Sequence, residues 1–212
     1  MQHPGKAPMS ATHISVRGTH TVERAPDLGT VTFIVRVERD DAEDCQAEFE
    51  EITEERAEEH QQLLTDGAII DVRHSSRLCW RAWVDGSPSF VRAQRHELTF
   101  VDLEVMSAFI HRNPAGPRLI DPTATVRLSP DTAGLLMSQT RRAAADDAAL
   151  RARDFADTGA QLTLISLREL WDTDTTLEAA WAGADMPTLR VTSAVEATYA
   201  VNGTAAPPTS PA

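Results

Sequence analysis

Histidine and cysteine are the residue types in this chain best suited to metal binding or nucleophilic chemistry. The histidines number seven, at His3, His13, His20, His60, His74, His96 and His111. No two of them have the spacing of an H-E-x-x-H motif or of a comparable pair of metal ligands. We therefore expect each to be an ordinary solvent-exposed or core histidine, and we assign no metal ligand.

The two cysteines, Cys45 and Cys79, are too few for a disulfide framework and fit no zinc-site spacing. Cys45 falls on the inward side of a predicted acidic helix, where a thiolate is disfavoured. His74 and Cys79 fall five residues apart on one predicted strand and should face opposite sides of it. The sequence also lacks a G-x-S-x-G elbow, a P-loop and a G-x-G-x-x-G turn. We predict a non-enzyme with no catalytic, cofactor-binding or metal-binding residue and no cofactor.

The composition is that of a folded, acidic protein. Of the 212 residues, 42% are apolar and 25% are charged, which is ordinary for a globular chain. Twenty basic and 32 acidic side chains give a net charge of −12. A protein that tracks nucleic-acid phosphates would carry the opposite sign, so we expect no nucleic-acid partner. No apolar run reaches the roughly 18 residues that a membrane-spanning helix needs.

Both ends of the chain differ in composition from the rest. Residues 1–12 are polar, contain two prolines and lack the apolar segment of a secretory signal. Residues 203–212 are small and proline-rich. We therefore expect a cytoplasmic protein with a flexible N-terminus over 1–12, one domain over 13–202 and a disordered tail over 203–212.

Between the ends, strand and helix periodicities alternate. Seven segments are predicted to be strands, over 14–18, 31–37, 69–84, 90–100, 124–128, 161–170 and 189–201, and the clearest alternation is that of 31–37 and 189–201. The strongest hairpin signal is Asp-Gly-Ser-Pro at 85–88. Residues 113–117 and 171–187 are expected to be irregular.

Three helices are predicted, each preceded by a capping residue. Asp40 or Asp41 caps a long helix that ends near Asp66, and Asp102 caps a short one that ends near Arg112. Ser129-Pro130-Asp131 opens a second long helix that runs to about residue 158. The order of elements predicts an α+β fold: an antiparallel or mixed sheet of six to seven strands with two long helices on one face.

The first long helix carries almost the whole net charge, with twelve acidic residues and one basic residue, Arg56, between Asp40 and Asp66. Its apolar stripe should dock on the sheet and consists of Ala42, Cys45, Phe49, Ile52, His60, Leu63 and Leu64. Two interpretations of the acidic face remain. It is either a solvated surface that confers solubility or a docking surface, over residues 40–66, for a basic protein partner or cations.

The second long helix has a stripe of mostly small residues, namely Ala133, Met137, Ala144, Ala148, Ala152 and Phe155. These side chains either pack in the core or contact another subunit. Trp80 and Trp83 should face opposite sides of one strand, one in the core and one exposed. Trp171 and Trp181 fall in or beside the connection 171–187, where they either anchor it in the core, which we expect, or contribute to an interface.

The order of the predicted elements resembles that of SIMPL-domain proteins. The similar features are I-S-V-R-G at 14–18, the A-P-D turn at 25–27 and the strand from Thr30. They continue through the acidic helix, the long hairpin, Leu128-Ser129, an alanine-rich helix and two closing strands, so that the resemblance covers about residues 13–201. The chain departs from the family in two places: Arg141-Arg142 and Asp146-Asp147 break the run of alanines, and the Pro/Gly stretch 113–117 replaces what is often a single glycine turn.

The resemblance implies a non-enzymatic protein. SIMPL-like proteins are mostly bacterial, are often exported to the periplasm or cell surface, and include relatives that form large ring- or channel-like oligomers. No catalytic residues come with the family. We therefore expect a self-associating scaffold or binding module, related by resemblance to the cell envelope or to stress, whose subunits pair through strand edges and the alanine-rich helix. The alternative is a small-molecule-binding protein or an unrecognised hydrolase with a pocket beside 171–187.

Overall fold

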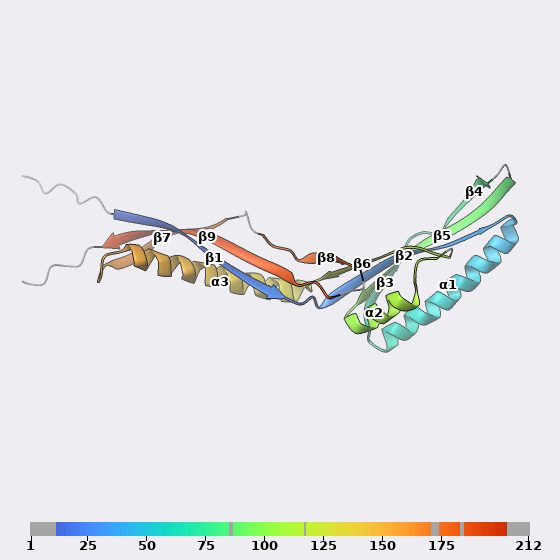
Figure 1. Ribbon diagram of the computed structural model, residues 1–212, viewed down its shortest axis with the longest axis horizontal. Helices are drawn as coiled ribbons and strands as arrows, with labels where there is room; N and C mark the ends of the chain where they lie inside the picture. Colours follow the sequence, from blue (N-terminus) through green and yellow to red (C-terminus); the bar gives the residue numbers. More distant parts are fainter. Residues whose placement is uncertain (1–11, 85–86, 117, 171–173, 183–184, 203–212) are drawn as a thin grey trace, which may run out of the picture. The chain divides into compact units, whose positions relative to one another are not determined.

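The computed structural model describes residues 12–84, 87–116, 118–170, 174–182 and 185–202. Within these ranges the chain forms nine strands and three helices (Figure 1). In chain order they are β1 (Thr12–Arg24), β2 (Leu28–Arg39), α1 (Ala42–Thr65), β3 (Ile69–His74), β4 (Leu78–Val84), β5 (Ser87–Phe100), α2 (Leu103–Arg112), β6 (Leu119–Arg127), α3 (Pro130–Phe155), β7 (Gln161–Leu170), β8 (Glu178–Trp181) and β9 (Leu189–Asn202). None of the helices in these ranges is both long and apolar enough to cross a membrane.

The chain divides into two compact units, each made of separate segments. The central unit comprises residues 24–130 and 176–189. The terminal unit comprises the described residues within 1–23, 131–175 and 190–212. Each unit has its own sheet and its own hydrophobic core.

The central unit is a six-stranded sheet with α1 and α2 on one side (Figure 1). The strand order is β3-β5-β2-β6-β8, and β4 also pairs with β5. All of these neighbours are antiparallel. Alternation along β2 buries Val31, Phe33, Val35 and Val37 on the side of the helices. The central unit therefore has one face covered by helices and one face left open.

Helix α1 begins at Ala42 because the Asp41 side chain accepts hydrogen bonds from the backbone N–H groups of Glu43 and Asp44. Gly67 follows the helix with φ of 72°, a conformation that suits glycine. The residues that α1 buries are Cys45, Phe49, Ile52, Thr53, His60 and Leu63. The predicted amphipathic helix is thus confirmed, although Ala42 and Leu64, placed on its apolar stripe, are exposed.

The predicted hairpin is present, but the long strand in front of it is broken. Val84 pairs with Ser87, and the turn residues 85–86 lie outside the described residues. The strand predicted over 69–84 is in fact β3 and β4, both paired with β5. Two hydrogen bonds of Ser75 stabilise the break between β3 and β4. Its N–H donates to the Arg95 carbonyl (2.9 Å), and its hydroxyl oxygen accepts from the Arg95 N–H (3.0 Å).

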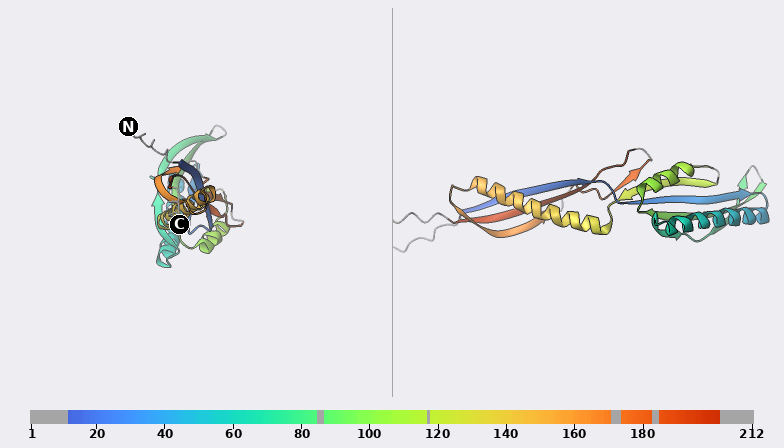
Figure 2. Two further views of the ribbon diagram at one scale, coloured as in Figure 1. Left: turned by 90° about the vertical axis from the view of Figure 1, so that its left-hand side faces the viewer. Right: turned by 90° about the horizontal axis from the view of Figure 1, so that it is seen from below.

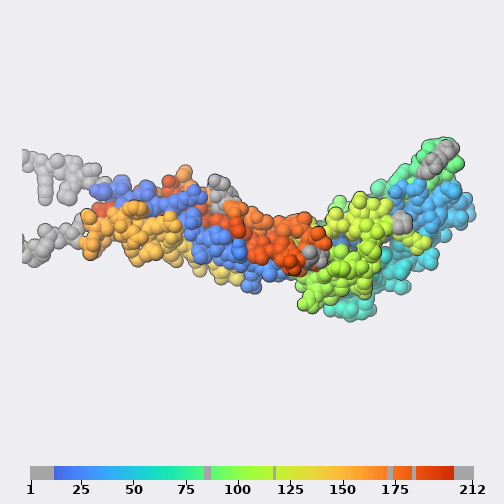
Figure 3. Space-filling model, in the orientation of Figure 1, coloured from blue at the N-terminus to red at the C-terminus, as the bar shows by residue number. Residues whose placement is uncertain are grey.

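The terminal unit is a three-stranded sheet, in the order β1-β9-β7, with α3 alongside it (Figure 2). Strands from opposite ends of the sequence, β1 and β9, lie side by side (Figure 3). Gly18 on β1 lets the helix approach closely, since a Cβ there would lie 2.5 Å from the backbone N of Ala148. The core between helix and sheet is made of Val16, Ala144, Ala148, Ala152, Val195, Ala197 and Tyr199.

The predicted α+β class with antiparallel strands is confirmed, but the arrangement differs in detail. The strands form two sheets instead of one, and the long helices α1 and α3 cover different sheets. The connection 171–187, predicted to be irregular, contains β8, which pairs with β6. Residues 1–11 and 203–212, predicted to be flexible, lie outside the described residues. Periodicity predicts which side chains are buried, whereas the choice of neighbouring strands depends on tertiary packing.

Candidate functional site

Strand β7 is an apolar edge of the terminal sheet. Among the described strands its sheet neighbour is β9 alone, and most of its side chains are exposed on both faces. Leu164, Ile165 and Leu167 are each at least 50% exposed. The opposite edge, β1, contributes none of the large exposed apolar side chains found in the described ranges. An exposed apolar edge is a template for pairing with another strand.

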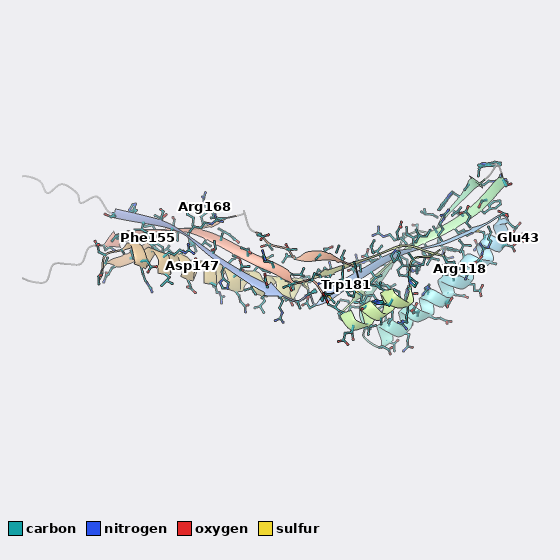
Figure 4. All side chains as sticks on the ribbon, viewed as in Figure 1. Glu43, Arg118, Asp147, Phe155, Arg168 and Trp181 are labelled. Carbon is teal, nitrogen blue, oxygen red and sulfur yellow. The ribbon has the colours of Figure 1, made fainter. Side chains whose placement is uncertain are left out.

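Charged pairs border this edge. Arg168 on β7, labelled in Figure 4, pairs with Glu196 on β9 at 2.9 Å. Arg141 on α3 pairs with Glu169 on β7 at 2.7 Å. The β7–β9 register shifts between Leu164 and Ser166, which marks a bulge. A bulge bends the strand locally, so it divides the edge into two short straight segments.

The alanine stripe of α3 is not available to another subunit. Ala144, Ala148 and Ala152 are completely buried against the terminal sheet. This confirms core packing and corrects the expectation that subunits pair through this stripe. Phe155, predicted to lie on the same stripe, is the last residue of α3 and is 74% exposed (Figure 4).

The acidic residues of the α1 region point away from the central sheet. Ten of the twelve acids between Asp40 and Asp66 are exposed; Figure 4 labels Glu43 at the start of the helix. The other two are half-buried in ion pairs. Glu48 pairs with Arg39 and, at 2.8 Å, with Arg118, and Glu59 pairs with Arg56 at 2.7 Å. Ten exposed carboxylates are therefore accessible on α1 and at its two ends.

The tryptophans differ partly from expectation. Trp80 pairs with Val91 and Trp83 with Pro88, so the two face opposite sides of β4 as predicted. Both are exposed, however, at 43% and 68%, because β4 is at the edge of its sheet. Trp181 is buried in the core of the central unit, as expected, and Trp171 lies outside the described residues.

The sequence predicts a pocket beside the connection 171–187. Residues 171–173 and 183–184 of this connection lie outside the described residues, and two hollows are lined by residues of the described part. One hollow, of about 210 Å³ in the terminal unit, is lined by Arg141, Glu169 and Thr175 among others. The other, of about 640 Å³, lies on the open face of the central sheet. Its walls are polar and include Thr30, Arg73, Arg95, Glu97, Thr123 and Glu178.

The fold brings together three histidines that sequence reasoning treats as unrelated. His96 on β5 lies between Phe33 on β2 and His74 on β3, each its directly paired residue. His60 on α1 lies over these side chains, on the side of the sheet that faces the helix. The ring centroids are 4.5 Å apart for His74–His96, 5.5 Å for His60–His96 and 5.8 Å for His60–His74. We call these three residues the histidine cluster.

Two members of the histidine cluster are buried in neutral form. Burial, reinforced by the charge of His74, lowers the pKa of His60 to about 4 and that of His96 to about 3. Both side chains are only 2% exposed, whereas His74 is exposed. None of the four ring nitrogens of His60 and His96 has a hydrogen-bond partner within the described structure.

The remaining histidines and the cysteines stay apart from the histidine cluster. His13, His20 and His111 are exposed, and His3 lies outside the described residues. Cys45 is buried, and burial raises the pKa of its thiol, in agreement with the predicted disfavoured thiolate.

The sequence predicts that Cys79 faces away from His74, and this prediction is wrong. The break between β3 and β4 changes the relation between the two residues. Their partners Arg92 and His96 lie four residues apart on β5, on one face of the strand.

Comparison with known proteins gives one family. The SIMPL family model, described as "Protein of unknown function (DUF541)", matches residues 14–211. A search of curated proteins found no match. The matched region contains all three helices and, apart from the first two residues of β1, both sheets described above. Since the match covers nearly the whole sequence, the chain belongs to the SIMPL family.

Proposed function

We propose that this protein is a non-enzymatic scaffold or binding module that associates with copies of itself through the outer edge of β7. The observation that carries the proposal is the edge position of β7 together with the exposure of its apolar side chains, of which Leu167 lies in the segment after the bulge. Burying such side chains against an identical strand removes apolar surface from water and satisfies edge N–H and C=O groups.

The sequence of β7 after its bulge favours a second copy as the partner. In an antiparallel pairing of two β7 strands centred between Arg168 and Glu169, each Arg168 lies opposite the Glu169 of the other copy. Leu167 then lies opposite Leu170 of the other copy. Opposite charges and apolar residues in directly paired positions stabilise antiparallel strands, and a twofold contact of this kind is self-complementary.

The test is the absolute mass in solution, measured by size-exclusion chromatography with light scattering at low and high salt. We expect a multiple of the 23.2 kDa chain mass at both salt concentrations, because apolar contacts are not screened by salt. Leu167→Lys should release monomers. Ile70→Lys is the matched control, because Ile70 is 59% exposed on a strand of the central sheet.

Two results would contradict the proposal. A wild-type mass of one chain at both salt concentrations removes self-association altogether. An unchanged oligomer in Leu167→Lys moves the contact to another surface.

The acidic surface of α1 supports the binding-module part of the proposal. Ten exposed carboxylates on α1 and at its two ends attract a basic protein, and the attraction weakens as salt rises. Binding to a polybasic peptide at low salt that disappears in Glu50→Lys/Glu54→Lys would support it. If the variant binds the peptide as well as wild-type protein does, the acidic surface of α1 serves only to keep the protein soluble.

A second candidate function, binding of a small molecule, rests on the hollow of about 640 Å³ in the central unit. Its size lies within the range of small-molecule sites. Any ligand that binds the folded state alone raises the melting temperature. A metabolite screen that produces a rise in wild-type protein, but not in Thr123→Trp, would support this function, and a screen without any rise would oppose it.

A further inference from the structure

The histidine cluster has the composition of a metal site. His60, His74 and His96 come from three different elements, and their ligand nitrogens all lie within 4.8 Å of one another. Nitrogens bound to one tetrahedral ion lie about 3.3 Å apart, given metal–nitrogen bonds of roughly 2.0–2.1 Å. The ligand nitrogens therefore need to move only a little closer together to bind one ion. Because His74 is exposed, its side chain has room to rotate toward the other two.

Side-chain packing and strand pairing place the three imidazoles on one side of the sheet. His96 stacks on Phe33, with ring centroids 5.1 Å apart and an interplanar angle of 12°. His74 is directly paired with His96, so both side chains leave the sheet on the side of α1. His60 is on the buried stripe of α1 and contacts the edge of Phe33 at a centroid distance of 6.1 Å. Neighbouring packing thus holds the imidazoles toward one point.

Unpartnered buried nitrogens distinguish this cluster from ordinary core histidines. Each neutral imidazole has one N–H donor and one acceptor nitrogen. All four ring nitrogens of His60 and His96 are buried without a hydrogen-bond partner in the described structure. Buried polar atoms in folded proteins almost always have a partner, because an unsatisfied group costs free energy. A metal ion would accept one lone pair from each ring.

The surrounding charges are compatible with a bound cation. Arg56 on α1 is a fixed positive group whose charge acts on both His60 and His96. Arg56 donates to Glu59 and to the side-chain oxygen of Asn113, each at 2.7 Å. The glutamate offsets much of the repulsion. Burial keeps both histidines neutral, the form in which imidazole binds a metal.

We propose that His60, His74 and His96 bind one divalent transition-metal ion of the zinc type. Three imidazoles favour zinc, copper or nickel over magnesium and calcium, which prefer oxygen ligands. Because His74 lies at the exposed side, the fourth coordination position opens to water. The ion would connect α1 to β3 and β5 and so clamp the helix onto the sheet. This inference does not depend on self-association through β7.

The test is a zinc titration of the full chain, prepared without a histidine tag, stripped of metal with EDTA and held at a slightly alkaline pH. A chromophoric zinc indicator competes for the ion, and excess Mg²⁺ occupies the acidic surface of α1. We expect one zinc ion per chain with a dissociation constant below about 1 µM and a rise in melting temperature of about 5 °C.

Variants locate the site. His74→Gln should weaken zinc binding at least about tenfold and abolish the thermal shift, and because His74 is exposed this variant should fold normally. His111→Gln and His13→Gln remove exposed histidines elsewhere and serve as matched controls. Cobalt(II) should give the intense visible absorption of a four-coordinate site in wild type and in both controls.

The following results would overturn the proposal. One is the absence of saturable zinc binding in wild-type protein. Another is unchanged affinity in His74→Gln, and a third is loss of binding in His13→Gln, which would place the ion at the N-terminal segment. Displacement of zinc by millimolar Mg²⁺ or Ca²⁺ would also overturn it, since oxygen ligands would then be responsible.

Discussion

At the scale of single residues, the buried histidines should make the metal-free protein sensitive to acid. In the unfolded chain a histidine has a pKa near 6.5, while the folded state lowers the pKa of His60 to about 4 and of His96 to about 3. Between these values the unfolded state binds more protons, so the free energy of unfolding falls as pH falls. His74 and Arg56 add positive charge that strengthens the effect.

Urea denaturation in EDTA at pH values of about 7.5, 6 and 5 measures this effect. We expect stability that is complete above about pH 6.5 and declines steadily below it. His96→Phe, which replaces one imidazole by an apolar ring, should show a shallower decline, and His111→Gln should follow wild type. A free energy of unfolding that stays constant over this range would show that the two rings are solvated.

At the scale of elements, the contact between β1 and α3 depends on a glycine. A Cβ on Gly18 would lie 2.5 Å from the Ala148 N and 2.8 Å from the Ala148 Cβ, and would overlap the Ala144 carbonyl oxygen. Backbone atoms cannot move aside cheaply, so Gly18→Ala should destabilise the protein by about 1–3 kcal/mol. The measurement is the urea midpoint at constant slope.

Gly134 provides the matched control for that substitution. It lies within α3, and a Cβ added to it would meet nothing within 4 Å. Gly134→Ala should therefore stabilise the protein by up to about 1 kcal/mol through helix propensity alone. Equal effects of the two substitutions would mean that β1 and α3 are not in close contact.

Elements are predictable where local chemistry decides them. The starts of α1 and α2 follow from the capping residues Asp41 and Asp102. The bounds expected for β7, residues 161–170, are also the observed ones, although its apolar alternation changes parity at Ile165. Strand β8 escapes prediction because four residues, Glu178–Trp181, are too few to show alternation. Its position depends on pairing with β6, which no local pattern encodes.

The histidine cluster escapes prediction because it depends on a one-residue change of register. If the register of β4 continued along β5, His74 would face Glu97 and point to the open side of the sheet. The break at residues 75–77 instead places His74 beside His96, next to Phe33 and under His60. A signal is present in the sequence, since Ser75 and Ser76 interrupt the apolar alternation of the predicted strand.

At the scale of the whole molecule, the two units have cores of different quality. The core of the terminal unit relies on Ala144, Ala148 and Ala152 from its helix. The core of the central unit contains larger side chains, including Phe33, Phe49, Phe100 and Phe109. Free energy from burial scales with the apolar area removed from water, so the terminal unit should be the less stable of the two.

Hydrogen exchange with mass spectrometry at increasing urea concentration tests this expectation. Amides of β7, β9 and α3 should exchange at lower urea than those of β2 and β5, because local opening follows local stability. Since β1 supplies the other edge of the terminal sheet, its amides should exchange together with those of β9. Uniform exchange across all strands at every urea concentration would show that the two units unfold as one.

The strand order of the terminal unit also has a consequence for biosynthesis. A ribosome releases β1 first among the described strands, β7 much later and β9 last, yet β9 is the strand that joins the other two. Residues 24–130 of the central unit are synthesised as one continuous segment, so this unit can begin to fold during translation. The terminal sheet, in contrast, cannot close until β9 has emerged from the exit tunnel, and until then the apolar β7 is a natural client for chaperones.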